Sequence, residues 1–204
     1  GSADVNRFYP ALGNHDVKDA GPGPTTYLDY FDLPGKGHPN TSGNERYYDV
    51  VEGPVHLFVL NSNPSEPDGI TAGSVQAKWL KTQLAASTSP WKIVVAHHPP
   101  YSSDSAHGPT AELQWPFAKW GANVVISGHA HTYERVDRDG IVYFVNGLGG
   151  AELYAFGAEA VTGSSFRYAQ GWGAQRVTAS STSLTFDFIG VDGAVLDSRT
   201  LTKQ

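Results

Sequence analysis

The chain of 204 residues is long enough for one domain that buries a sizeable core, and it contains no continuous apolar run long enough to span a membrane. Its formal net charge of −6, with no basic tract, argues against a nucleic acid as a dedicated partner. Because the chain has no cysteine, disulfides and thiolate metal sites are excluded. The 23 glycines, 13 prolines and 10 tyrosines are typical of a loop-rich, aromatic-packed globular fold.

The first half of the chain predicts strands and a helix joined by loops. Glycine, proline, asparagine and threonine are concentrated in residues 19–44, which predict a long surface loop. Ser74 is a plausible N-cap, and the apolar residues that follow it fall along one helical face. In chain order, we expect a strand at 7–12, the loop at 19–44, a hairpin of strands at 46–51 and 55–61, and a helix at 74–86.

The second half predicts further alternation of strand and helix and then an all-β segment. Two apolar runs predict buried strands, and Pro116 must kink the helix expected between them or lie in its first turn. Alternating residues near 185–188 and the Asp192-Gly193 turn predict a hairpin. The expected elements are strands at 91–96, 123–127 and 141–145, a helix at 110–120, and strands at 174–179, 184–189 and 194–200. No internal repeat or domain boundary is evident, so residues 1–204 predict a single domain.

Histidine-containing motifs follow three of the predicted strands. They are GNHD at 13–16, HHPP at 97–100 and GHAH at 128–131. Ligands of sheets flanked by helices gather in the crevice beyond the carboxyl ends of the strands. Imidazole is the commonest metal-ligating side chain, and asparagine adds a carbonyl oxygen. This mixture suits a borderline or harder divalent transition metal, namely Zn, Mn or Fe, and the candidate ligands are Asn14, His97, His129 and His131.

His15 has a different predicted role from the ligands around it. With Asn14 directed at a metal, the adjacent side chain can point toward the open face of the site. Asp16 could then orient the imidazole ring, as carboxylates do for catalytic histidines. An imidazolium there could stabilise charge on a phosphate or protonate a leaving oxygen. We therefore treat His15 and Asp16 as candidate catalytic residues.

Taken singly, several of these residues also have a structural interpretation. His15 could cap a turn, and the His97-His98 pair could be a rigid loop start whose ring N–H groups bond to the backbone. His107 lies in a Ser/Asp-rich segment and is interpreted as a solvated loop residue unless the site lies nearby. His38 and His56 have no supporting context and are interpreted as structural.

Two further segments are interpreted structurally. Residues 133–135 (YER) predict a core aromatic residue and a local salt bridge. Residues 146–150 (NGLGG) have the composition of a phosphate-binding loop, but no clear helix follows them, so a generic turn is favoured.

Together, the three motifs resemble the last three motif blocks of the calcineurin-like metallophosphoesterases, specifically their purple acid phosphatase branch. The blocks are GNHD at 13–16, VVAHHPPY at 94–101 and GHAHTYER at 128–135, and the resemblance covers essentially the whole chain. It implies an α/β (α+β) fold, a metallophosphoesterase-type β-sandwich flanked by helices. It also implies metal-dependent hydrolysis of a small phosphate ester, and it favours an extracytoplasmic or secreted location.

The resemblance assigns roles by position. It implies that three residues bind one metal ion, namely Asn14, His97 and His129. It implies that His131 binds a second metal ion. His15 takes the place of the phosphate-binding or acid residue, and His107 that of a substrate-facing histidine. His98 falls at a variable position and receives no metal-binding role.

The chain also departs from the family pattern. The family places two further blocks before the GNHD loop, which supply a bridging carboxylate, a second aspartate and a tyrosine ligand. No Gly-Asp-x-x-Tyr string occurs here, and Asp104, Asp137 and Asp139 lack the matching context. We therefore expect an N-terminally truncated domain with one metal ion rather than two, because a bridging anion offsets the repulsion between paired dications.

The missing strands would leave sheet edges exposed, which favours a possible homo-oligomer. Two alternatives to a working hydrolase stay open: an impaired or inactive metal- or phosphate-binding remnant, and one part of a two-chain enzyme. The sequence does not distinguish a monoester from a diester substrate, nor does it identify the metal.

Overall fold

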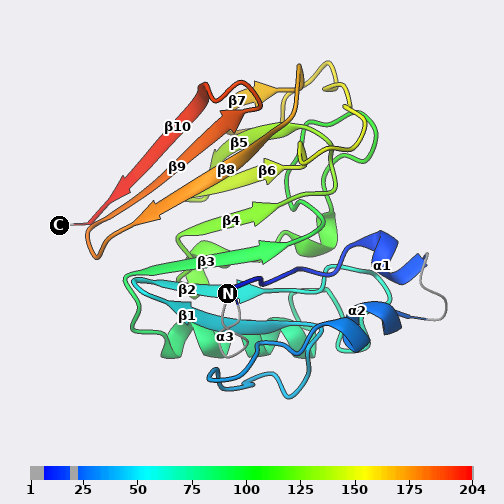
Figure 1. Cartoon of the computed structure of the whole chain (residues 1–204), viewed down its shortest axis with the longest axis vertical. Helices are drawn as coiled ribbons and strands as arrows, with labels where there is room; N and C mark the ends of the chain where they lie inside the picture. Colours follow the sequence, from blue (N-terminus) through cyan, green and yellow to red (C-terminus); the bar gives the residue numbers. More distant parts are fainter. Residues whose placement is uncertain (1–6, 19–22, 204) are drawn as a thin grey trace.

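The computed structural model describes residues 7–18 and 23–203, which form two β-sheets packed face to face (Figure 1). The larger sheet has seven strands in the order β1-β2-β3-β4-β6-β5-β7, and the smaller has three in the order β10-β9-β8. Within the larger sheet β2, β3, β4 and β6 run parallel. The carboxyl ends of these four strands therefore meet at one edge, and α1 lies beyond that edge (Figure 1).

The elements follow one another as short helices and strands. The helices are α1 (Asn14–Lys18), α2 (Thr25–Tyr30), α3 (Val75–Ala86), the 3₁₀ turn η1 (Ala111–Leu113) and α4 (Phe117–Trp120). The strands of the larger sheet are β1 (Tyr48–Glu52), β2 (Val55–Val59), β3 (Trp91–Ala96), β4 (Val124–Ser127), β5 (Tyr133–Arg138), β6 (Ile141–Asn146) and β7 (Ser164–Tyr168). Those of the smaller sheet are β8 (Gly173–Ala179), β9 (Ser183–Gly190) and β10 (Val195–Thr202). In this part of the chain no helix has the length and apolar character needed to cross a membrane.

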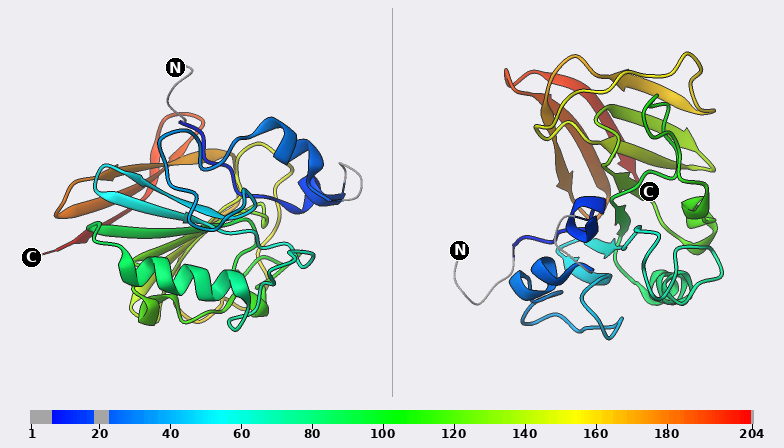
Figure 2. Two further views of the ribbon diagram at one scale, coloured as in Figure 1. Left: turned by 90° about the horizontal axis from the view of Figure 1, so that it is seen from below. Right: turned by 90° about the vertical axis from the view of Figure 1, so that its right-hand side faces the viewer.

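The core has one layer on each face of the larger sheet, because successive side chains of a strand point to opposite faces. On one face, Val94 packs in a cluster with Leu80 and Leu84 of α3. On the other, residues such as Ile93 pack against Phe186 and Phe188 of the smaller sheet. Figure 2 shows α3 on the opposite side of the sheet from α1, α2 and the C-terminal strands. The expected sandwich flanked by helices is confirmed.

Several local expectations are also confirmed. The predicted hairpin is β1 and β2, paired antiparallel, and the predicted C-terminal strands form the smaller sheet. The Oγ atom of Ser74 accepts a hydrogen bond from the Ala77 N–H at 3.1 Å and so caps α3 as expected. Val75, however, is 58% exposed and does not belong to the buried face of this helix.

The strand expected at 7–12 is not formed. Instead, the carbonyl of Pro10 accepts hydrogen bonds from the hydroxyls of Tyr27 and Tyr48, at 2.8 and 2.7 Å. Proline lacks a backbone N–H and is unsuited to a central strand. The segment is therefore held by side chains and by burial of Leu12 against β1 and β2.

Three other expectations are corrected. The loop expected at 19–44 contains α2, while residues 19–22 lie outside the described part of the chain. The helix expected at 110–120 is divided into η1 and α4, because Pro116 stands between them as the N-cap residue of α4. Strands β5 and β7 were not expected, since the charged residues of β5 concealed its pattern.

Candidate metal centre

Two loops that follow neighbouring parallel strands bring the candidate ligands together. His97 comes directly after β3 and His129 two residues after β4. The Gly128 N–H donates to the His97 carbonyl at 3.0 Å and joins these loops. Asn14 begins α1, which lies over the same edge of the sheet. The expectation that the carboxyl ends of the strands converge here is therefore confirmed by the fold.

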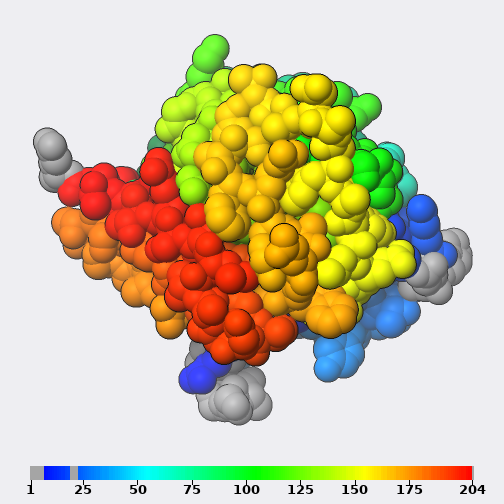
Figure 3. All heavy atoms as spheres, turned by 90° about the horizontal axis from the view of Figure 1, so that it is seen from above, coloured from blue at the N-terminus to red at the C-terminus, as the bar shows by residue number. Residues whose placement is uncertain are grey.

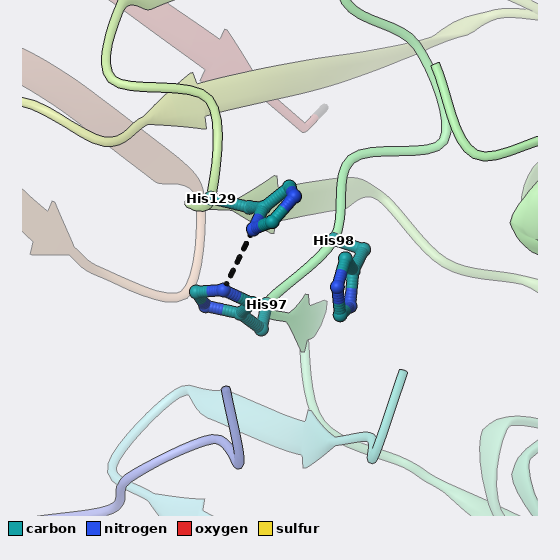
Figure 4. A group of neighbouring side chains, drawn as sticks. All are labelled: His97, His98 and His129. Carbon is teal, nitrogen blue, oxygen red and sulfur yellow. Dashed lines mark hydrogen bonds between the residues drawn. The ribbon is translucent and has the colours of Figure 1, made fainter. Parts of the chain in front are cut away.

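Three donor atoms from these loops form a compact triangle. His97 Nε2 lies 2.8 Å from Asn14 Oδ1 and 3.0 Å from His129 Nδ1. His129 Nδ1 lies 3.1 Å from Asn14 Oδ1 and closes the triangle. Figure 4 shows the rings of His97 and His129 directed toward one another.

This triangle fits a divalent ion. Neighbouring donors about 2.1 Å from one ion, at angles near 90°, lie roughly 3.0 Å from each other. Two imidazole nitrogens and one amide oxygen match the donor preferences of Zn²⁺, Mn²⁺ and Fe²⁺. The residues are only partly buried, so a ligand can reach them from solvent.

The environment keeps both imidazoles neutral. Burial, followed by the proximity of His98 and other histidines, lowers the pKa of His97 to about 4. The same causes, burial first, lower the pKa of His129 to about 3. A neutral imidazole offers the nitrogen lone pair that a metal requires.

The loop that carries His129 combines an unusual backbone conformation with a close crossing by a glycine of the neighbouring loop. His129 has φ of 63°, in the left-handed region that few non-glycine residues adopt. Gly147 crosses this loop so closely that a Cβ atom there would lie 1.9 Å from the Ala130 carbonyl oxygen. The Gly147 N–H donates to the Thr132 carbonyl at 3.0 Å. The close crossing therefore fixes the loop that presents His129 and His131.

His131 lies in the same loop but outside the triangle. Its Nδ1 atom is 2.8 Å from the Glu152 carbonyl, and its ring stacks on Tyr154 with a centroid distance of 4.1 Å. Because a carbonyl oxygen only accepts, Nδ1 carries the proton and Nε2 keeps a lone pair. Metal-ligating histidines commonly have their second nitrogen held in this way.

The triangle opens into a cavity of about 440 Å³. The described residues that line it include histidines from four segments and a lysine, namely Asn14, His15, Lys18, His97, His107, Gly128, His129, His131, Asn146, Gly147, Gly149 and Tyr154. In Figure 3 the yellow segment before β7 lies beside the blue N-terminal elements, and both contribute to this lining. Among these described residues none is acidic, which suits an anionic ligand.

Two of the candidate catalytic and substrate-binding residues, His15 and His107, line this cavity. His15 is exposed and lines it, while the Asp16 carboxylate accepts a hydrogen bond from the Gly13 N–H at 2.8 Å. His107 also lines it and packs on the His129 ring with a centroid distance of 4.1 Å. Its loop is held by Asp104, whose carboxylate accepts the His107 N–H. His107 is thus an exposed loop residue, as interpreted, but its loop borders the cavity, which was the condition for a role in the site.

Two residues of the site had no assigned role in the sequence. Ring nitrogens of His97, His98 and His129 lie within 4.8 Å of one another, although His98 was set aside as a variable position. Lys18 lies four residues after Asn14, one helical turn away, and its side of α1 faces the cavity. The helical spacing from Asn14 is a signal that could have identified it.

The core aromatic residue expected at 133–135 is confirmed, since Tyr133 is fully buried. The expected local salt bridge is only part of the finding: Arg135 pairs with Asp137 at 3.2 Å, but its Nε atom also lies 2.9 Å from the carboxylate of Asp197, 62 positions away. Glu134 is fully buried and accepts hydrogen bonds from Ser103. Residues 147–150 form an irregular loop after β6, and this segment also lines the cavity.

Two models of protein families match this chain and support its resemblance to the metallophosphoesterases. A family model described as calcineurin-like phosphoesterase matches residues 2–133. A second, described as iron/zinc purple acid phosphatase-like protein C, matches residues 140–198.

Individual relatives match only part of their own length. Purple acid phosphatase 1 of Ipomoea batatas is 30% identical over 138 residues, which are 62% of this chain and 28% of that protein. Fe(3+)-Zn(2+) purple acid phosphatase 12 of Arabidopsis thaliana is 43% identical over 113 residues, 50% of this chain and 23% of the relative. The chain thus spans about a quarter of the length of these relatives.

A solved structure matches the whole fold. A purple acid phosphatase from yellow lupin (Lupinus luteus) seeds covers 98% of this chain, with a TM-score of 0.75 and 21% identity, over 38% of its own length. At this identity the likeness concerns the fold. It supports the sandwich described above rather than any particular substrate.

Proposed function

The chain belongs to the calcineurin-like phosphoesterase family, and from that premise we propose that it is a metal-dependent phosphoric ester hydrolase. The observation that carries the proposal is the triangle of Asn14 Oδ1, His97 Nε2 and His129 Nδ1, with sides of 2.8 to 3.1 Å. These atoms would hold a divalent transition metal, with His131 as a further nitrogen donor beside them. When bound, the ion would supply Lewis acidity toward the ester oxygens and lower the pKa of water.

The chain's own residues would bind the phosphate and handle the proton. Lys18 and His107 line the cavity and would attract the negatively charged ester. His15, exposed and lining the cavity, would donate a proton to the leaving oxygen. Asp16 would act on this step by holding the loop that carries His15, since its carboxylate bonds to the Gly13 N–H.

We propose that the centre holds one ion rather than two. Among the described residues, the group of potential ligands is three histidines without a carboxylate. Two dications about 3.5–4 Å apart normally share an anionic bridge that offsets their repulsion. His131 alone would not supply that charge. Metal analysis of the purified protein would test this number, and two ions per chain would contradict it.

The hydrolase proposal is tested with metal-stripped protein reloaded with Zn²⁺, Mn²⁺ or Fe²⁺. Hydrolysis of p-nitrophenyl phosphate and of bis(p-nitrophenyl) phosphate compares a monoester with a diester. We expect metal-dependent turnover that falls by at least about 100-fold in His129→Ala, because one ligand of the triangle is removed. His38→Ala, far from the centre, serves as the matched histidine control. Absence of metal-dependent turnover above that of a His15→Ala variant would refute the enzyme.

A second candidate function is a metal- or phosphate-binding module without turnover. The group of three histidines favours this second function, because without a carboxylate the positive charge of a bound ion would be less well compensated. Calorimetry with inorganic phosphate, with and without Zn²⁺, distinguishes the two. Binding without hydrolysis supports the module, and restored hydrolysis on adding a separate family N-terminal segment would support a two-chain enzyme. An extracytoplasmic or secreted location is also proposed, and secretion of the native protein tests it.

A further inference from the structure

His98 is the imidazole nearest to the proposed ligands that the proposed function leaves unused. Its ring nitrogen and those of His97 and His129 lie within 4.8 Å of one another. Its ring centroid is 4.9 Å from that of His97 and 4.4 Å from that of His129. Figure 4 shows its ring beside the other two, on the same loop as His97. The family resemblance assigns no metal-binding role to this position, so its place beside the ligands is a finding of the structure.

A buried serine fixes the orientation of His98. Ser62, which is 1% exposed, places its Oγ 2.8 Å from His98 Nδ1. The same Oγ accepts the backbone N–H of His98 at 2.9 Å. In the tautomer whose Nδ1–H donates to this oxygen, Ser62 Oγ accepts both N–H groups of His98, and Nε2 keeps the lone pair that a metal requires. A histidine whose second nitrogen is held by a buried partner has the arrangement commonly seen around metal ions.

We propose that His98 is a metal ligand in this chain, adding a third imidazole to those of His97 and His129 and to the Asn14 amide oxygen, with His131 as the further donor beside them. The proposal rests on the proposed function only in requiring that the centre bind an ion. Three neutral imidazoles favour Zn²⁺ and Co²⁺ over Mn²⁺, which prefers oxygen donors. His98 would thereby add a nitrogen donor to a ligand group that has no carboxylate. The resulting site is selective for nitrogen-preferring ions.

A different role for His98 is packing. Its ring lies against His129 at a tilt of 51°, so it could position that ligand without touching the ion. A phenyl ring at this position keeps most of the packing and removes both nitrogens. His98→Phe therefore separates coordination from positioning, and Ser62→Ala tests whether the hydroxyl orients the ring.

The experiment uses metal-stripped full chain titrated with Zn²⁺, Co²⁺ and Mn²⁺ against a chelator, with Co²⁺ visible absorption as the spectroscopic signature. We expect His98→Phe to lose at least about 100-fold in Zn²⁺ affinity, more than the roughly 10- to 100-fold found when groups that only support a ligand are removed. The Co²⁺ absorption bands should shift, and the Zn²⁺ preference over Mn²⁺ should narrow. Ser62→Ala should show a smaller loss in the same direction.

Controls make each outcome decisive. His38→Phe should bind all three ions as the parent chain does. Circular dichroism checks folding, and His98→Gln replaces His98→Phe if the phenyl variant does not fold. Unchanged Zn²⁺ affinity and Co²⁺ absorption in the folded variant would overturn this inference and leave the proposed function intact. If the parent chain binds none of the ions, the inference and the proposed metal-dependent function both fail.

Discussion

Two groups of histidines in this molecule have opposite surroundings. One is represented by His56 of β2, whose two ring nitrogens both contact oxygen atoms. Its Nε2 is 2.7 Å from the Asp49 carboxylate of β1, and its Nδ1 is 2.8 Å from Oγ of Ser87, which follows α3. His97 and His129 instead direct nitrogens at each other and at one amide oxygen. The first group is complete without a ligand, whereas the second gathers lone pairs around one point.

The contrast shows what distinguishes a structural histidine from a candidate ligand. A buried imidazole paired with a carboxylate and a hydroxyl satisfies its hydrogen-bonding capacity within the fold. Neutral imidazoles that lie together without a carboxylate satisfy this capacity only in part. Their pKa values are low because protonating them in this buried, histidine-rich place is unfavourable. Changes at His56 should therefore reduce stability, and changes around His129 should reduce metal binding.

The largest effect should come from Gly147→Ala. The new Cβ would lie 1.9 Å from the Ala130 carbonyl oxygen, so the loop that carries His129 must move. We expect metal binding to be lost in calorimetry, because the ligands would no longer converge. The matched control is Gly149→Ala, in the same loop, where nothing lies within 4 Å of an added Cβ. If the Gly147 variant bound Zn²⁺ like the control, the close crossing would not govern the site.

The triangle could be predicted from the sequence because its signals are local. The HHPP and GHAH motifs follow β3 and β4, and parallel strands bring their carboxyl ends together, whereas GNHD follows the irregular segment at 7–12 and reaches the same edge at the start of α1. The orientation of His98 was not predictable, since it depends on Ser62, 36 positions earlier in the chain. Sequence alone does not show that this hydroxyl is buried beside the loop.

The elements of the fold, like the parts of the site, were predictable where their sequence signals are local. The β1–β2 hairpin, α3 and the C-terminal strands have clear local patterns and turn residues. β5 does not, because its Glu134 and Arg135 are satisfied by distant partners, Ser103 and Asp197. The segment at 7–12 fails as a strand for the converse reason: tyrosine hydroxyls satisfy its backbone carbonyl in place of a neighbouring strand.

His56→Ala should produce the next largest effect, and on stability alone. Asp49 is 6% exposed and would keep Thr41 as a partner while losing the imidazole. Removing one hydrogen-bond partner of a buried polar group costs about 1–3 kcal/mol. We expect this loss in urea denaturation, with Zn²⁺ affinity unchanged in the folded protein. A change in affinity without a change in stability would remove the distinction between the two histidine groups.

Acidification should destabilise the metal-free protein through the other group. His97 and His129 have folded pKa values of about 4 and about 3, below the ordinary 6.5, so the unfolded state binds protons first as the pH falls. Their contribution is fully present above pH 6.5 and is lost progressively toward pH 4. Between pH 7 and pH 5, we expect about 2 kcal/mol from His97, and at most the same from His129, because both folded pKa values lie below this range and water screens the more accessible His129 ring. Urea denaturation in a chelator at several pH values measures this. The free energy of unfolding should depend less on pH in a His97→Gln, His129→Gln double variant. An unchanged pH dependence would show that other groups cause the acid sensitivity.

The smallest effect should come from His38→Ala, which tests whether partial pairing suffices to make a histidine important. His38 Nε2 lies 3.4 Å from the Tyr9 hydroxyl and 3.9 Å from the half-exposed Glu52 carboxylate. Such contacts are longer and more solvated than those of His56, and exposed pairs contribute about 0–1 kcal/mol. We expect a change in unfolding free energy below about 1 kcal/mol and unaltered Zn²⁺ binding. If His38→Ala reduced the free energy of unfolding as much as His56→Ala, then proximity to a carboxylate would decide how much a histidine contributes to stability. Burial with both ring nitrogens paired would then not be required.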